Sequence, residues 1–309
     1  MADSSFHPEL RASARWLPRG VVRSWSLWLM ARLPTPAPRL PDGVTVEERP
    51  LGGTSASVRI LRASGSSRRA PVVLWIHGGG YVVGRAKQDD LVCARMAQRL
   101  GAVVVSVDYR LASNHPFPAP LDDCVAAWDL LQREAASLGV DAKRAIIAGQ
   151  SAGGGLAAGL VLRLADSGRP MPILQVLVYP MLDDRTVLRQ VDERHHRVWD
   201  QNSNAIGWSK YLGRPPGGAD VSEHAAAARR ADLRGLPPAW IGVGTLDLFH
   251  DEDLDYARRL EAAGVPVEVE LVPGAYHGFD AVLPRAPVSK AFVEARVRAM
   301  ERAFHRSTP

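Results

Sequence analysis

Short apolar runs alternate with longer helical stretches along most of this chain, and this alternation restricts the fold more than any other feature. The runs at residues 72–76 and 145–148 are wholly apolar, as is typical of parallel strands that are buried on both faces. Residues 44–48 and 57–61 instead alternate apolar and polar side chains, which predicts half-buried antiparallel strands. The pattern predicts eight strands, at residues 44–48, 57–61, 72–76, 102–107, 145–148, 173–178, 239–243 and 267–272.

Helical stretches lie between and after these strands. They are predicted at residues 88–100, 119–138, 151–166, 251–264 and 287–305. Strands and helices that alternate in this way form a mostly parallel sheet covered by helices. The sequence therefore predicts an α/β fold with a mostly parallel eight-stranded sheet.

Two segments outside this alternation predict a helical cap. Apolar side chains at helical spacing near the N-terminus predict a helix that packs over the core or, as the alternative, lies on a membrane surface. They are Trp16, Val21, Trp25, Trp28 and Met30. Between residues 183 and 238 the alternation lapses, which is typical of a functional insertion. We expect a cap of residues 1–42 and 183–215 on a core of residues 43–182 and 216–309.

Composition and charge exclude several classes of protein. The 309 residues are 46% hydrophobic and 23% charged, which is typical of a globular protein and not of a disordered, collagen-like or disulfide-rich chain. The net charge is +5, but no basic run is present, so no nucleic-acid partner is expected. Residues 145–162 carry no charge, yet glycines, Gln150 and Ser151 interrupt them. A strand, a turn and a buried helix fit this segment better than a span stably inserted in a membrane.

Cys93 and Cys124 are the only cysteines. Two thiols do not make a tetrahedral zinc site by themselves, and one disulfide would not explain a fold of this size. Buried free thiols in a reducing compartment are expected, and the N-terminus lacks the sustained apolar region of a secretory signal. These features predict a cytoplasmic protein.

The segment Gly149-Gln150-Ser151-Ala152-Gly153 follows a predicted buried strand and precedes a predicted helix. Its two glycines permit a tight strand-to-helix turn that pushes the Ser151 hydroxyl out of the sheet. The N–H of Ala152, at the helix N-terminus, is free to meet a developing negative charge. This context predicts a nucleophilic serine, and a plain glycine-rich turn is the alternative.

A serine nucleophile needs a base and an acid, which in this topology follow it in the order serine, acid, histidine. His277 follows the last predicted strand and Asp247 the strand before it, so both are expected where open α/β sheets place their sites. Asp251 and Glu252 compete for the role of the acid, but they stand where capping of a following helix explains them. The competing histidines do not follow the last strand. They are His195, His196 and His250.

A glycine-rich segment, His77-Gly78-Gly79-Gly80, follows the predicted strand at residues 72–76. Glycines let backbone N–H groups approach a ligand with no Cβ in the way. A phosphate-binding loop would need the pattern G-x-x-x-x-G-K-[ST], and the lysine is absent. We expect the N–H groups of Gly78, Gly79 and Gly80, with that of Ala152, to form an oxyanion hole, in which each donor contributes about 10²–10³ in rate.

Together these residues resemble the hormone-sensitive-lipase-like family of α/β-hydrolases, the bacterial family IV esterases. The matching segments are His77-Gly78-Gly79-Gly80, Asp108-Tyr109-Arg110-Leu111-Ala112, His115-Pro116-Phe117-Pro118, Gly149 to Gly154, Leu236-Pro237-Pro238-Ala239, Asp247 with Asp251-Glu252, and His277-Gly278-Phe279. The resemblance implies an α/β-hydrolase fold with a cap, in which Ser151 is the nucleophile, His277 the base and acid, and Asp247 its orienting partner. It implies no metal or organic cofactor, and a homodimer formed through the last strand and the C-terminal helix.

Four positions depart from the family pattern. Gln150 stands where the family usually has Asp or Thr, and Ser113-Asn114 replaces the usual Pro-Glu. Leu248 replaces the usual Pro after the acid, and the Pro expected near residues 226–228 is missing. None of these positions belongs to the triad. They bear on the electrostatics of the serine turn and therefore on substrate preference and pH optimum.

The resulting hypothesis is hydrolysis of short- to medium-chain acyl or aryl esters of small molecules through an acyl-enzyme. An apolar substrate pocket is predicted, with core packing as the alternative for each of its members. These are Tyr81, Val82, Tyr109, Trp208, Tyr211, Leu248 and Phe279. The same triad supports amide or lactone hydrolysis, or acyl transfer in secondary metabolism. A catalytically silent small-molecule-binding protein on this fold is a further alternative, which the presence of His277 disfavours.

Overall fold

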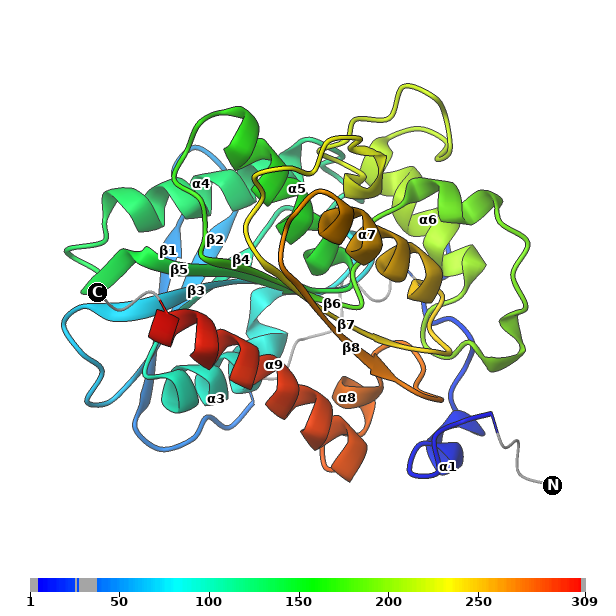
Figure 1. The fold of residues 1–309 in the computed structure, drawn as a ribbon, viewed down its shortest axis with the longest axis horizontal. Helices are drawn as coiled ribbons and strands as arrows, with labels where there is room; N and C mark the ends of the chain where they lie inside the picture. Colours follow the sequence, from blue (N-terminus) through cyan, green and yellow to red (C-terminus); the bar gives the residue numbers. More distant parts are fainter. Residues whose placement is uncertain (1–4, 26, 28–37, 307–309) are drawn as a thin grey trace.

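One eight-stranded sheet organises the chain, with the strand order β1-β2-β4-β3-β5-β6-β7-β8 (Figure 1). The computed structural model describes residues 5–25, 27 and 38–306. β2 pairs antiparallel with both β1 and β4, and the other neighbouring strands pair in parallel. The strands are β1 (Val44–Pro50), β2 (Ser57–Ala63), β3 (Ala70–Ile76), β4 (Val103–Asp108), β5 (Val140–Gln150), β6 (Leu174–Val178), β7 (Ala239–Gly244) and β8 (Val267–Val272).

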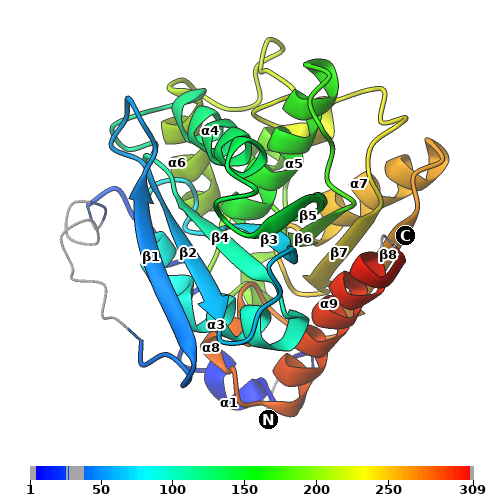
Figure 2. The same ribbon diagram turned by 90° about the vertical axis from the view of Figure 1, so that its left-hand side faces the viewer.

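Helices cover both faces of the sheet (Figure 2). One face packs against α4 (Ala119–Arg133), α5 (Ala152–Asp166) and α7 (His250–Ala262). The other packs against α3 (Asp90–Leu100) and α9 (Pro287–Arg306), with α8 (Phe279–Val282) against α9 and α1 (Arg11–Ala14) in the same apolar cluster. The remaining elements are α6 (Gln201–Leu212), η1 (Ala86–Asp89), η2 (Asp184–Leu188), η3 (Glu193–His195) and η4 (Ala227–Arg229).

The burial of each strand follows from its place in the sheet. β3, β6 and β7 are buried at every position because helices cover both of their faces. β1 and β8 form the two edges and leave part of their side chains exposed. The predicted α/β fold and all eight predicted strands are confirmed, and β5 begins earlier than predicted, at Val140. Its first residues pair with β3 across a register shift between Ala70 and Val72.

The N-terminal segment differs from the helix that the sequence predicts. Helix α1 ends at Ala14, and Trp16 and Trp25 are 89% and 78% exposed, so they share no buried face. Pro18 lacks an N–H and disfavours a helix that continues from α1. A Cβ on Gly20 would lie 2.0 Å from the Asp200 carboxylate, so this part of the chain packs closely against the insertion. Trp28 and Met30 lie outside the described residues.

Backbone hydrogen bonds join the N-terminal segment to the insertion that follows β6. The N–H of Val21 donates to the carbonyl of Val198 at 3.0 Å, and the N–H of Val198 donates to the carbonyl of Pro18 at 2.9 Å. Arg23 adds two hydrogen bonds to the carboxylate of Asp200, at 2.7 and 3.1 Å. The two segments expected to form a cap are therefore in direct contact.

Helix α6 lies inside this insertion, in a stretch that the sequence pattern marks as irregular. The Asp200 side chain caps its N-terminus by accepting the N–H of Ser203 at 2.9 Å. Gly213, with a φ of +67°, ends it. Both cap residues are ordinary helix boundary signals, and they could have revealed the helix despite its weak apolar periodicity.

No helix in the described part of the chain is long and apolar enough to cross a bilayer. The uncharged residues 145–162 instead form the end of β5, the turn at Ser151 and most of α5.

Candidate active site

Ser151 lies in the sharp turn between β5 and α5, and its backbone is strained. Its φ of 54° and ψ of −121° lie in a region that residues with a side chain rarely adopt. Close backbone approaches require the flanking glycines. A Cβ on Gly149 would lie 2.2 Å from the carbonyl oxygen of Gly153, and a Cβ on Gly153 would lie 2.1 Å from that of Ile76. The turn has the strand–serine–helix geometry of a nucleophile elbow.

His277 connects Ser151 to Asp247. Its Nε2 lies 3.0 Å from the serine Oγ, and its Nδ1 lies 2.8 Å from the Asp247 Oδ2. The other carboxylate oxygen of Asp247 accepts the N–H of Phe249 at 3.0 Å, which fixes the carboxylate. Since all three side chains are buried, their mutual electrostatic interactions are stronger than they would be in water.

The carboxyl ends of different parallel strands bring these three residues together. Ser151 follows β5, Asp247 follows β7, and His277 follows β8. Parallel strands end at the same edge of a sheet, so side chains that are far apart in the sequence meet there.

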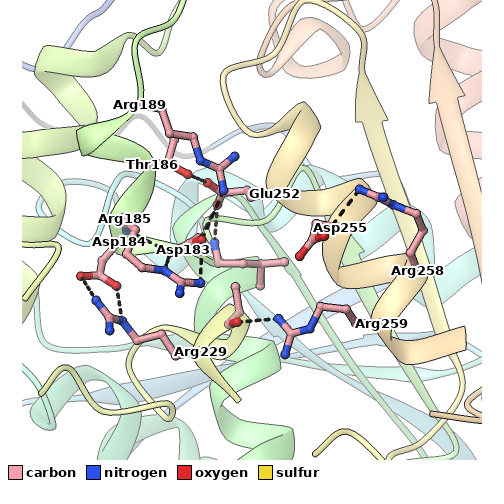
Figure 3. A network of polar contacts seen from close by, with 12 residues as sticks. Asp183, Asp184, Arg185, Thr186, Arg189, Arg229, Glu252, Asp255, Arg258 and Arg259 are labelled. Atoms are coloured by element: carbon pink, nitrogen blue, oxygen red, sulfur yellow. Dashed lines mark hydrogen bonds and ion pairs between the residues drawn. The ribbon is translucent and has the colours of Figure 1, made fainter. Parts of the chain in front are cut away.

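Glu252, a competing acid in the sequence, has no hydrogen bond to His277 among the described residues and holds the base of the insertion instead (Figure 3). Its carboxylate accepts the N–H groups of Leu182 at 2.7 Å and Asp183 at 3.1 Å, and the hydroxyl of Thr186. Burial raises the pKa of Glu252 to about 8. Glu252 therefore has a structural role in joining α7 to the start of the insertion.

The remaining competitors also lie outside the Ser151–His277–Asp247 arrangement. Asp251 pairs with the neighbouring His250 at 2.7 Å on an exposed part of the chain. His195 packs edge-on against the ring of Phe6, with ring centroids 5.5 Å apart. Burial lowers the pKa of His196, but this histidine has no hydrogen bond to Ser151 among the described residues.

Glycines form the wall opposite the serine turn. A Cβ on Gly78 would lie 3.3 Å from the Cβ of Ser151. Gly79 and Gly80 have φ values of +120° and +58°, which favour glycine. Within the described residues, no acceptor is bonded to the N–H groups of Gly79, Gly80 or Ala152. These donors remain available to an anionic oxygen near Ser151.

A cavity of about 290 Å³ adjoins Ser151 and His277. The N-terminal segment, the glycine loop, the insertion and the end of α8 all contribute to its walls. It is lined by Val21, Val22, Gly78, Gly79, Gly80, Val83, Gln88, Gln150, Ser151, Tyr179, Val198, Trp199, His277, Gly278, Ala281 and Val282. The walls are therefore mainly apolar, with the carboxamides of Gln88 and Gln150 as polar groups.

None of the seven residues predicted for the substrate pocket lines this cavity. They are Tyr81, Val82, Tyr109, Trp208, Tyr211, Leu248 and Phe279, and all are buried. Tyr81 stacks on Tyr211 with ring centroids 3.9 Å apart, and its ring lies 5.5 Å from that of Trp208. Tyr109 stacks on His77 at 4.2 Å. These aromatic rings therefore pack against one another, as in the alternative of core packing.

Four of the cavity residues that the sequence pattern missed come from the N-terminal segment and the insertion. Val21 and Val22 belong to the described residues 5–25 of the N-terminal segment. Val198 and Trp199 lie in the insertion, just before α6. Periodicity could not find them because they lie on irregular backbone. Their only signal was the concentration of apolar side chains in two segments that are otherwise rich in Arg or polar residues.

Gln150, which departs from the family pattern, bonds to a buried carboxylate. Its Nε2 lies 3.1 and 3.3 Å from the two oxygens of Asp89. The indole N–H of Trp75 also donates to Asp89, at 2.8 Å. Burial raises the pKa of Asp89 to about 6. The residue before Ser151 is thus anchored to the end of η1.

Carboxylates and a histidine that could hold a metal ion gather at Asp166, Glu223 and His224. The guanidinium of Arg230 bonds to both Asp166 and Glu223, and His224 bonds to Asp166 at 2.7 Å. A cation is already present in this cluster, so the residues fit an ion-pair network better than a metal site.

Comparisons with known proteins agree with this architecture. Residues 73–281 match a family model described as the alpha/beta hydrolase fold. The carboxylesterase NlhH of Mycobacterium tuberculosis is 34% identical over 285 residues, which cover 89% of this chain and 88% of the relative. The ethyl acetate hydrolase of Pseudomonas putida is 35% identical over 220 residues, which cover 67% of this chain and 65% of the relative.

Solved structures match along nearly the whole chain. A bacterial heroin esterase is 36% identical with a TM-score of 0.86, and the match covers 97% of this chain and 98% of that one. The esterase LipW from Mycobacterium marinum is 34% identical with a TM-score of 0.85, over 97% of this chain and 96% of that one. Sequence, fold and the arrangement around Ser151 thus agree, and the chain belongs to the hormone-sensitive-lipase-like family of α/β-hydrolases.

Proposed function

We propose that this protein is a serine carboxylesterase that hydrolyses small-molecule esters through an acyl-enzyme. The observation that carries the proposal is the continuous hydrogen-bonded series Ser151–His277–Asp247, with distances of 3.0 and 2.8 Å, at the wall of a cavity. Relatives with carboxylesterase names support the same activity.

In the proposed mechanism His277 takes the hydroxyl proton of Ser151 while the serine oxygen attacks the ester carbonyl. Asp247 holds the imidazole in the tautomer that presents an unprotonated Nε2, and it stabilises the imidazolium that forms. His277 then gives the proton to the leaving alkoxide. In the second half of the reaction it activates a water, which releases the acid and regenerates the serine.

The negative charge that develops on the carbonyl oxygen would be met by the N–H groups of Gly79, Gly80 and Ala152, with Gly78 close by. Their lack of other acceptors among the described residues supports this role. The positive φ values of Gly79 and Gly80 are a backbone arrangement that exists before substrate binds. Donors fixed in advance stabilise the transition state without a cost of reorganisation.

The proposed substrates are short- to medium-chain acyl or aryl esters. A cavity of about 290 Å³ with mainly apolar walls is small for a ligand site and suits a compact ester. We propose that residues 1–42 and 183–215 form the cap of this site on a core of residues 43–182 and 216–309. The contacts of Val21 with Val198 and of Arg23 with Asp200 support this division.

Assembly and location complete the proposal. Two copies would pair through β8, an edge strand, and α9. Val269 and Leu271 of β8 are 37% and 40% exposed, which supports an interface at this edge. A cytoplasmic location is supported by Cys93 and Cys124, which are buried free thiols.

Hydrolysis of p-nitrophenyl esters with acyl chains from C2 to C12 tests the function. We expect activity on the shorter chains in the wild type and its loss in a folded Ser151→Ala variant. Equal activity in both proteins would refute the role of Ser151. A folded wild type without any activity on the series would refute the general esterase and favour an amide, lactone or acyl-transfer substrate, or a silent binding protein.

A further inference from the structure

We propose that the Trp199 indole limits substrate size by closing the side of the active site that faces α6. This inference rests on the proposed ester hydrolysis and specifies its substrate class. The substrates would be esters whose acyl chain, on that side of Ser151, is short. Trp199 is 3% exposed and lines the cavity. Its ring lies beside the base of the triad, with its centroid 6.2 Å from that of His277.

The indole fits against two glycines. A Cβ on Gly80, in the proposed oxyanion loop, would lie 2.1 Å from Cη2 of Trp199 and 2.9 Å from its Cζ2. A Cβ on Gly207, in α6, would lie 3.4 Å from the same Cζ2 and 2.9 Å from the carbonyl oxygen of Gly80. The six-membered ring of Trp199 therefore occupies the junction between the oxyanion loop and α6.

An apolar layer continues from this junction. The residues that follow the two glycines in the chain, Tyr81 and Trp208, have ring centroids 5.5 Å apart, and Tyr211 stacks on Tyr81 at 3.9 Å. Removal of the indole would therefore create an apolar space beside Ser151, bounded by glycines and by this layer. An acyl chain that the wild type rejects could occupy that space.

The backbone around Trp199 is held firmly. The preceding residue, Val198, exchanges two backbone hydrogen bonds with the N-terminal segment, and the next residue, Asp200, caps α6 and pairs with Arg23. The indole N–H lies 3.5 Å from Asn204 Oδ1, at the limit of a hydrogen bond. The backbone that carries the indole is therefore fixed on both sides of Trp199.

The test is the chain-length profile of Trp199→Ala, measured as kcat/KM on p-nitrophenyl esters from C2 to C12. Each methylene that the new space accommodates should raise kcat/KM about fourfold. We therefore expect the ratio of C8 to C2 activity to rise by more than tenfold. The ratio is unaffected by the fraction of folded enzyme, so partial unfolding does not imitate the result. Trp199→Phe, which keeps a ring, should give a smaller increase.

Trp208→Ala is the matched control. It removes the same side chain from the neighbouring layer, but the intact Trp199 still separates that space from the cavity. We expect a loss of stability with the wild-type chain-length ratio. An unchanged ratio in Trp199→Ala, or an equal rise in Trp208→Ala, would overturn the proposal.

Failure of the proposed function would be recognised separately. Addition of Ser151→Ala to Trp199→Ala should abolish hydrolysis of both short and long chains. Retained hydrolysis in that double variant would refute Ser151 as the nucleophile, whatever the effect of Trp199 on the ratio.

Discussion

Replacement of Glu252 by Gln should make the protein more stable at alkaline pH. The Glu252 side chain is buried, and its pKa is raised from the usual 4.5 to about 8. One carboxylate oxygen accepts the N–H groups of Leu182 and Asp183, and the other accepts the hydroxyl of Thr186 (Figure 3). A Gln carbonyl can accept the same two N–H groups, and its amide can donate to Thr186 Oγ1. Gln therefore imitates the protonated acid without its titration.

The magnitude follows from the difference between the two pKa values. The folded state binds the proton more tightly than the unfolded state, so its stability is greatest at low pH and is lost as the pH rises from 4.5 to about 8. At about 1.4 kcal/mol per pH unit, the full range corresponds to about 5 kcal/mol. Between pH 5 and pH 9, we expect the stability of the wild type to fall by several kcal/mol relative to Glu252→Gln.

Urea denaturation of both proteins at pH 5, 7 and 9 measures this difference. The other titrating groups are common to both proteins, including the buried Asp253, whose pKa burial also raises. Contributions from groups that do not interact with Glu252 cancel in the comparison. The repulsion between Glu252 and Asp253, which also raises the pKa of Asp253, is absent from the variant and adds to the difference in the same direction. Unfolding free energies that change in parallel with pH in the two proteins would refute the reasoning.

Three further variants test separate parts of the structure. Asp247→Asn should lower kcat by about 10³–10⁴, because an amide stabilises the wrong tautomer of His277; a loss below tenfold in an ester assay would contradict the triad. Gly149→Ala should destabilise the protein by about 1–3 kcal/mol, because its Cβ would lie 2.2 Å from the Gly153 carbonyl oxygen; an unchanged Tm would argue against this close packing. Arg23→Gln should speed proteolysis of the N-terminal segment. The free energy of unfolding should change by only about 0–1 kcal/mol, because the ion pair with Asp200 is partly exposed. Cleavage at the wild-type rate would show that the pair does not hold the segment.

The sheet and the meeting of Ser151, His277 and Asp247 were predictable because their signals are local or follow from topology. Apolar runs such as residues 72–76 indicate burial on both faces by composition alone. Once the sheet is parallel, Ser151, Asp247 and His277 must emerge at one edge, since each follows a strand. The predicted N-terminal helix was wrong over residues 15–25 for the converse reason. Helical spacing of tryptophans was outweighed by Pro18 and by backbone hydrogen bonds to Val198, a partner that periodicity does not reveal.

By itself, the sequence determined the fold class, the eight strands and the proposed nucleophile, base and acid, because short periods and chain order encode them. Only the tertiary structure decided which side chains line the cavity beside Ser151. Tyr81 packs against Trp208 of α6, whereas Val22 and Trp199, from segments far apart in the chain, line the cavity. The walls of a pocket depend on how distant segments fill space together, and no local pattern records that packing.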